Sequence, residues 1–123
     1  MKVSDLEVYQ RLCVLVLTVH KLTLTFPKFE RYELGSQVRR SSNAIPANLA
    51  EGFDNKHVNI YLECISRAQG ELRETVHHLT MVYRKGYCTR ENIEPILQEY
   101  DVCGRMLTRL EQSLRYGYRQ PIT

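Results

Sequence analysis

Residues 58–82 read VNIYLECISRAQGELRETVHHLTMV, and this stretch decides the fold. Two sets of mostly apolar residues recur in it at every seventh position: Val58, Ile65, Leu72 and Leu79, and, between them, Tyr61, Ala68, Thr75 and Val82. The alternating steps of three and four place both sets on one face of an α-helix. Gly86 follows the pattern and is expected to end the helix. The stretch therefore predicts a long amphipathic helix that buries one face.

Three other segments repeat this spacing. Their apolar positions are Val8, Leu12, Leu15, Val19, Leu22 and Phe26 in the first; Leu34, Val38, Ile45, Leu49 and Phe53 in the second; and Ile93, Ile96, Tyr100, Cys103, Leu107, Leu110 and Leu114 in the last. Short loops join the segments, which favours antiparallel packing of neighbouring helices. We expect an all-α fold, an antiparallel up-down-up-down four-helix bundle that forms a single domain over residues 1–123.

Capping residues and prolines predict where the first two helices begin and end. Ser4 and Glu7 fit a capping box at the start of the first helix. Pro27 is expected to end that helix, because a proline pushes the preceding residue out of the helical conformation. The second helix is predicted over about 30–53. Pro46 lies inside it and predicts a kink or a break.

The last helix has two alternative starts, which the sequence leaves open. Thr89 is a suitable cap, but Pro95 would then lie in the second turn of the helix. Asn92 as the cap would instead put Pro95 at the third helical position. From about Gly117 to the end of the chain the apolar period is absent, and we expect a flexible tail.

Composition and charge are typical of a globular protein of the cytoplasm. Hydrophobic residues make up 43% and charged residues 25% of the chain, and the formal net charge is +3. The longest apolar run, 13–17, is far too short to cross a membrane, and the opening residues lack the order of a signal peptide. The four cysteines form no Cys-x-x-Cys pair and show no zinc-ligand spacing. We expect a cytoplasmic protein with no membrane contact and no metal.

Catalytic and metal-binding patterns are weak. Glu74 and His77 match the Glu-x-x-His step of carboxylate-bridged di-iron bundles, but such a site needs a second copy of the step on another helix. The sequence contains no second copy, so a metal-dependent oxidoreductase is the least favoured hypothesis and solvated surface residues are the simpler interpretation. The sequence also lacks a nucleophile elbow and a glycine-rich phosphate loop. We expect no enzymatic activity and no cofactor.

Residues 39–52 carry a distinctive motif: the pair Arg39-Arg40, a run of small residues, and then Ile45-Pro46-Ala47-Asn48-x-Ala50-Glu51-Gly52. The motif resembles the hallmark of a bacterial four-helix bundle family, the 23S ribosomal RNA intervening-sequence proteins. Weaker similarity extends over roughly residues 6–114. The resemblance implies a ring-shaped homopentamer, because related members form one. It also implies a function linked to RNA, since a related accessory protein of diversity-generating retroelements binds nucleic acid and a reverse transcriptase.

Five arginines are the candidates for contact with nucleic acid: Arg39, Arg40, Arg105, Arg109 and Arg115. Guanidinium groups bind phosphates well. Arg115 also opens a stretch, 115–119, in which arginines flank tyrosines, and such rings can stack on bases. The simpler interpretation of the first two arginines is an ion pair with an acid such as Glu51 or Glu71.

Two functional hypotheses follow. The leading one is a non-enzymatic, oligomeric bundle that binds structured RNA or an RNA-handling protein through basic surface residues. The alternative is a protein-only scaffold in which the arginines form ion pairs between subunits. Asn48 and Glu51 fit a role in local geometry or at a subunit interface better than a role in ligand binding. Tyrosines are enriched at interfaces, and five are candidates for the subunit contact: Tyr9, Tyr32, Tyr61, Tyr83 and Tyr87.

Overall fold

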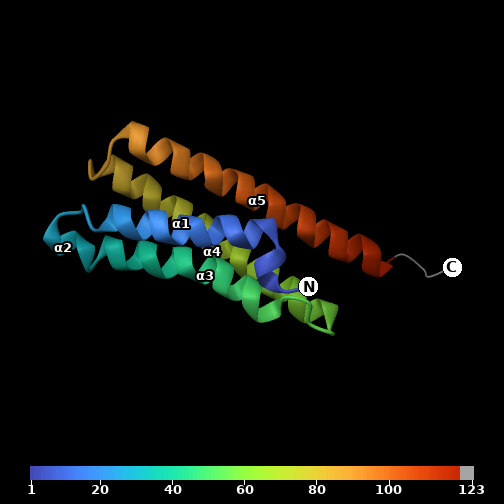
Figure 1. The fold of residues 1–123 in the computed structure, drawn as a ribbon. Helices are drawn as coiled ribbons and strands as arrows, with labels where there is room; N and C mark the ends of the chain where they lie inside the picture. The colour runs from blue at the N-terminus through green and yellow to red at the C-terminus, as the bar shows by residue number, and fades with distance from the viewer. Residues whose placement is uncertain (120–123) are drawn as a thin grey trace.

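Four long helices, running alternately up and down, build the protein (Figure 1). The computed structural model describes residues 1–119, with side chains through residue 117. Its elements are the 3₁₀ turn η1 (Val3–Asp5) and the helices α1 (Glu7–Thr23), α2 (Lys28–Arg31), α3 (Leu34–Gly52), α4 (Val58–Arg84) and α5 (Arg90–Arg119). None of these helices has the length and apolarity needed to span a bilayer. The predicted all-α, antiparallel four-helix bundle is confirmed.

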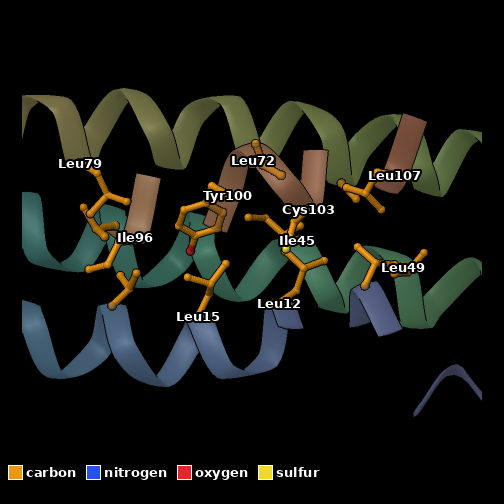
Figure 2. Packing of buried hydrophobic residues seen from close by; sticks show 14 of the residues in the cluster. Leu12, Leu15, Ile45, Leu49, Leu72, Leu79, Ile96, Tyr100, Cys103 and Leu107 are labelled. Carbon is orange, nitrogen blue, oxygen red and sulfur yellow. The ribbon is translucent and has the colours of Figure 1, made fainter. Parts of the chain in front are cut away.

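The core lies between the four long helices. Helix α1 packs against α3 and α5, and α4 packs against the same two helices, so that α3 and α5 are diagonal to one another. Tyr100 of α5 is the largest fully buried side chain and stands among leucines and isoleucines of the neighbouring helices (Figure 2). Burial raises the pKa of its phenol, because a charged ring would lie in apolar surroundings.

The apolar faces predicted from periodicity are the buried faces. Of the eight positions in 58–82 that decided the fold, seven are buried, and Val58 at the first residue of α4 is half-buried. In the other three segments, the half-buried apolar positions lie at or near the ends of each set: Leu22, Phe53, Leu110 and Leu114. The helical period therefore located the core to within a turn at each end.

Helices α3 and α4 touch most closely where α3 ends. A Cβ atom built on Gly52 would lie only 2.6 Å from Sγ of Cys64, so a larger residue would push the two helices apart. Two residues later, Asp54 has a positive φ of 54°, a conformation that aspartate tolerates better than most residues. Gly52 thus serves both as the last residue of α3 and as its contact point with α4.

The start of α1 differs from the prediction. Ser4 and Glu7 form no capping box: α1 begins at Glu7, and its N-cap residue, Leu6, makes no side-chain bond. Ser4 lies inside η1 instead, where the carboxylate of Asp5 accepts a bond from the backbone amide of Lys2 at 2.8 Å. This tight turn removes Ser4 from the position in which its hydroxyl could cap α1.

The connection from α1 to α3 also differs. Helix α1 ends at Thr23, and the helix predicted over 30–53 is divided into α2 and α3. Phe26 still reaches the core, where its ring lies 5.6 Å from that of Tyr87. The hydroxyl of Thr23 donates to the carbonyl oxygen of His20 at 2.7 Å, a local bond that competes with continuation of a helix.

Pro46 does not break α3, which is continuous from Leu34 to Gly52. Of the two predicted outcomes, a kink or a break, the break is therefore wrong. Pro46 is buried, and its neighbours Ile45 and Leu49 are fully buried. Packing against α1 and α4 holds the helix across the position at which the proline removes one backbone hydrogen bond.

The start of α5 resolves the alternatives left open by the sequence. The backbone amide of Asn92 donates to the hydroxyl of Thr89 at 3.2 Å, and α5 begins at Arg90. Thr89 is therefore the cap, and Asn92 is excluded from that role. Pro95 lies in the second turn, and the helix continues through it.

At its other end, α5 runs to Arg119. Residues 117–119 of the expected flexible tail therefore continue the helix, and the flexibility of the tail stays a prediction. Residues 120–123, and the side chains of residues 118 and 119 in the predicted arginine–tyrosine stretch, lie outside the described part of the chain.

The core faces are tested by Leu107→Ala and Leu72→Ala. Each substitution should lower the free energy of unfolding by about 2–5 kcal/mol. The larger loss is expected at Leu107, which is 0% exposed against 8% for Leu72. Urea denaturation measures both, and Leu24→Ala, at a side chain that is 53% exposed, is the control and should cost no more than about 0.5 kcal/mol. Unchanged denaturation midpoints for both core variants would contradict the assigned faces.

Candidate nucleic-acid interface

Arg39 is held at the corner between α1 and α3. Its Nη1 donates to Oγ1 of Thr23 and its Nη2 donates to the carbonyl oxygen of Arg31, both at 2.8 Å. A Cβ atom at Gly35 would lie 3.0 Å from Nη1 of Arg39, so the glycine leaves room for the guanidinium. The half-buried side chain of Arg39 therefore joins the ends of α1, α2 and α3, rather than standing open to a phosphate.

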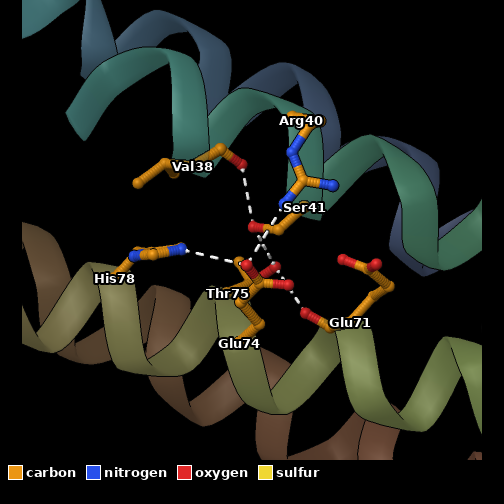
Figure 3. A network of polar contacts seen from close by, with 7 residues as sticks. All are labelled: Val38, Arg40, Ser41, Glu71, Glu74, Thr75 and His78. Atoms are coloured by element: carbon orange, nitrogen blue, oxygen red, sulfur yellow. Dashed lines mark hydrogen bonds and ion pairs between the residues drawn. The ribbon is translucent and has the colours of Figure 1, made fainter. Parts of the chain in front are cut away.

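Arg40 faces outward. Its Nη2 lies 3.2 Å from Oε1 of Glu74, and the two side chains are 63% and 40% exposed (Figure 3). An ion pair was the simpler interpretation, but the acids named for it, Glu51 and Glu71, are not the partner. The register of the antiparallel helices α3 and α4 places Glu74 beside Arg40 instead.

A buried hydroxyl pair fixes this register. Oγ1 of Thr75 in α4 lies 2.8 Å from Oγ of Ser41 in α3, and both residues are fully buried. The Thr75 hydroxyl is also 2.8 Å from the carbonyl oxygen of Glu71, and the Ser41 hydroxyl donates to the carbonyl oxygen of Val38 at 3.3 Å. Because each hydroxyl has a polar neighbour on both helices, a shift of register would leave buried polar groups unpaired.

Two carboxyl groups surround Arg40 in the α3–α4 seam (Figure 3). Besides Glu74, which also lies 3.4 Å from Nε2 of His78, the seam contains Glu71. Oε2 of Glu71 is buried and has no hydrogen-bond partner among the described residues. Burial, followed by the neighbouring charge of Glu74, raises the pKa of Glu71. A guanidinium beside two carboxyl groups is not a favourable phosphate-binding site, because the carboxyl groups compete with the phosphate for it.

The arginines of α5 lie on its exposed surface. Arg105 pairs with Asp101 at 2.9 Å and Arg115 pairs with Glu111 at 3.1 Å, each one turn away along the helix. Arg109 is exposed and has no acidic partner within ion-pair distance in the described part of the chain. Pairs of this exposed i,i+4 type contribute only about 0.3–0.5 kcal/mol, so a phosphate can compete for their guanidinium groups.

The structure does not bring the five candidate arginines together. Arg39 and Arg40 belong to α3, whereas Arg105, Arg109 and Arg115 belong to α5, which is diagonal to α3. Arg105 and Arg109 are one turn apart and share a face of α5. The candidates therefore form two groups on different sides of the bundle, and only the group on α5 is free of competing buried carboxyl groups.

The motif residues divide between the core and the surface. Ile45, Pro46 and Gly52 are buried, and Nδ2 of Asn48 donates to the carbonyl oxygen of Ala44 in its own helix at 2.8 Å. The outward residues are Ala47, Ala50 and Glu51. A shallow hollow between α1 and α3 is lined by Tyr9, Cys13, Val16, Leu17, Asn43, Pro46 and Ala47. The motif thus builds the helix contact on one side and borders an open face of α1 on the other.

The predicted Glu-x-x-His step does not act as a unit. Glu74 pairs with Arg40 and lies near His78. His77 is exposed and makes no ion pair with Glu74 in the described part of the chain. The described residues contain no group of three or more His, Cys, Asp or Glu side chains placed to hold a metal ion.

One charged cluster escaped the sequence analysis. The buried carboxylate of Glu30 in α2 accepts bonds from the hydroxyl of Tyr87 at 2.7 Å and from Nζ of Lys85 at 3.0 Å. The hydroxyl of Tyr87, and then the ammonium of Lys85, lower the pKa of Glu30. These residues are more than fifty positions apart and follow no helical period, so no local pattern could have paired them.

Comparison with known proteins places the chain in a family. Residues 4–109 match the family described as 23S rRNA-intervening sequence protein. The chain belongs to this family. Its fold is similar to that of a solved protein of unknown function from Bacteroides thetaiotaomicron VPI-5482, assigned to the S23 ribosomal protein family. The two are 23% identical, with 85% of this chain and 97% of that chain covered and a TM-score of 0.74, which establishes the fold alone. No curated protein matches the chain.

The raised pKa of the Glu71 carboxyl predicts how the stability of this protein depends on pH. Because its pKa is raised in the folded protein, the folded state holds a proton that the unfolded state releases at lower pH. Stability should therefore fall as pH rises from about 4.5 through the raised pKa. Glu71→Gln stays neutral and should remove this fall, making the variant more stable than the wild type at neutral pH.

Urea denaturation between about pH 4 and pH 8 measures the effect. Glu51→Gln, at an exposed carboxyl of α3, is the matched control and should keep the wild-type profile. Parallel profiles for the wild type and the Glu71→Gln variant would show that the carboxyl pair does not retain a proton.

Proposed function

We propose that the protein is a non-enzymatic, oligomeric helical bundle that binds structured RNA, or an RNA-handling protein, through basic surface residues of α5. The observation that carries the proposal is the exposed pair Arg105 and Arg109 on one face of that helix, with Arg109 lacking an acidic partner in the described part of the chain. Membership of the family described as 23S rRNA-intervening sequence protein supports the link to RNA. The formal net charge of +3 multiplies in an oligomer and favours an anionic partner.

Arg39 and Arg40 have smaller parts in this proposal than their place among the candidate arginines suggested. Arg39 holds the α1–α3 corner through Thr23 and Arg31, so its loss would weaken the fold before it weakened a ligand contact. The positive charge of Arg40 is offset by its ion pair with Glu74 and by the neighbouring carboxyl of Glu71. The electrostatic attraction for RNA therefore rests on α5.

The oligomer we propose is a homopentamer that uses the open face of α1. Val14 and Leu17 on this face are 64% and 65% exposed, an amount of apolar surface that favours burial against another subunit. The hollow beside Leu17 includes Tyr9 and the motif residue Pro46. Among the tyrosines considered for the contact, Tyr61 is wrong, because it is 6% exposed and belongs to the core.

Light scattering tests the assembly. The wild-type protein at roughly ten micromolar should have the mass of five chains, and the double variant Val14→Asp/Leu17→Asp should dissociate, because burying two carboxylates is costly. Ile60→Asp, at a 43% exposed apolar residue on α4, is the control and should leave the mass unchanged. A monomeric wild type would refute the oligomer.

The RNA contact is tested with Arg105→Gln/Arg109→Gln on nuclease-treated protein. The variant should bind an RNA hairpin more weakly than the wild type, and the salt dependence should flatten by roughly 0.7–0.9 per lost phosphate contact. Arg67→Gln is the matched control, because Arg67 is exposed and pairs with Glu63 at the same i,i+4 spacing.

The mass of the same double variant separates the two hypotheses. In a protein-only scaffold whose arginines form ion pairs between subunits, the variant would dissociate, and any RNA affinity would fall only as a consequence. An intact oligomer with unchanged affinity for RNA and unchanged salt dependence would show that these arginines of α5 do not bind RNA.

A further inference from the structure

Two aromatic rings stand exposed at one end of the bundle, one on the short helix α2 and one on the residue that follows it. Phe29 is 70% and Tyr32 is 75% exposed, and neither ring packs against another aromatic ring in the described part of the chain. Their spacing of three places them side by side on one face of a helical turn. Rings exposed to this extent add little to the stability of the fold, so they are available to a ligand.

The turn that carries these rings is firmly anchored. Between the two rings, Glu30 points inward and binds Lys85 and Tyr87. On the same turn, Nε of Arg31 donates to the carbonyl oxygen of Phe26 at 2.9 Å, and the carbonyl oxygen of Arg31 accepts the bond from Arg39. A platform held in this way loses little conformational entropy when a ligand binds.

The surroundings of the rings are positively charged. The end of the bundle that contains α2 also contains the turn between α4 and α5 (Figure 1), and residues 20–33 and 84–91 together hold six lysines and arginines against three glutamates. One of the three glutamates, Glu30, pairs with Lys85, and one of the six cations, Arg90, pairs with Glu94 just outside these ranges. Lys21, Lys28 and Arg84 are exposed and have no acidic partner within ion-pair distance in the described part of the chain.

We propose that this end of the bundle, the α2 corner, binds unpaired nucleotides of a single-stranded nucleic acid. The corner is defined by Lys21, Lys28, Phe29, Arg31, Tyr32 and Arg84. Phe29 and Tyr32 stack on bases, and the surrounding cations bind the phosphates, which is how proteins bind single strands without sequence preference. This inference rests on the proposed RNA function and adds to it a second, chemically different contact, because the rings contact bases that are splayed out of a duplex.

The charge of the corner argues against a two-fold contact in which the same corner of a second copy is the occupant. Two such corners facing one another would bring like charges together, which costs several kcal/mol at an interface. A nucleic acid strand supplies both of the groups that complement the corner: a negative backbone for its cations and flat bases for its rings. A protein partner remains the competing occupant, and the experiment below separates it.

The chain contains no tryptophan, so the variant Phe29→Trp places a single indole at the corner, and its emission can be excited selectively at wavelengths that the tyrosines do not absorb. A uridine oligonucleotide of about 20 nucleotides, as RNA and as its DNA counterpart, should quench the emission of this variant, since bases stack on the ring. Heparin, which has charge but no bases, should not quench it. Ile60→Trp, at the start of α4 and the far end of the bundle, is the control and should show no quenching.

Affinity gives the second readout. Phe29→Ala/Tyr32→Ala should weaken binding of the oligonucleotide about tenfold or more, the effect of losing a stacked ring, with the salt dependence unchanged because neutral rings release no counterions. Lys28→Gln should instead flatten the salt dependence by roughly 0.7. The thermal midpoint of each variant should match that of the wild type, since all three side chains are exposed.

Each of the following outcomes would refute at least one part of the proposals. Oligonucleotide binding by the wild type that survives Phe29→Ala/Tyr32→Ala, or equal quenching of the Phe29→Trp and Ile60→Trp variants, would refute the corner and leave RNA binding by α5 standing. A wild type that binds neither the oligonucleotide nor an RNA hairpin would refute both. A loss of oligomer mass in Phe29→Ala/Tyr32→Ala would identify the rings as a protein contact and refute the corner as a nucleic acid site.

Discussion

The close packing of α3 on α4 is the constraint on which the rest of the structure depends. Gly52 allows the two helices to touch at Cys64, and the hydroxyl groups of Ser41 and Thr75 meet 2.8 Å apart in the middle of the same seam. One contact is steric and the other polar, so together they fix both the separation and the register of the helices. With the register fixed, Arg40 lies beside Glu74. The buried contacts between α3 and α4 therefore determine which charged side chains pair on the surface of this seam.

Internal pairing of charge decides which surfaces can attract an anion. Arg39 bonds to oxygen atoms of Thr23 and Arg31 inside the chain, and Arg40 shares a seam with two carboxyl groups. Among the cations considered for an anionic partner, those that remain available lie on the outer face of α5 and at the α2 corner. A count of arginines in the sequence cannot make this distinction, because it depends on which acids the fold brings within about 4 Å.

Periodicity predicted the fold well because burial has the period of the helix. The stripe from Tyr61 to Val82 is buried as expected, and a local pattern contains that information. Helix ends were less predictable, since the turn at Asp5 and the bond from Thr23 to His20 depend on local competition between hydrogen bonds. The acid beside Arg40 and the cluster at Glu30 could not be predicted, because contacts between distant helices leave no trace in the spacing along the chain.

The proposed ring changes what a weak site can achieve. A corner with two rings and a few cations binds a short stretch of nucleic acid loosely, but every subunit of a symmetric oligomer presents the same corner. Once one corner holds a strand, the others meet the same molecule at a high effective concentration, and the combined affinity exceeds that of any one corner. The rigidity of the corner then matters most, because the anchoring of α2 by Glu30 keeps identical sites at fixed distances. In this arrangement the half-buried ion pair of Glu30 and Lys85 in one subunit contributes to the geometry of the whole assembly.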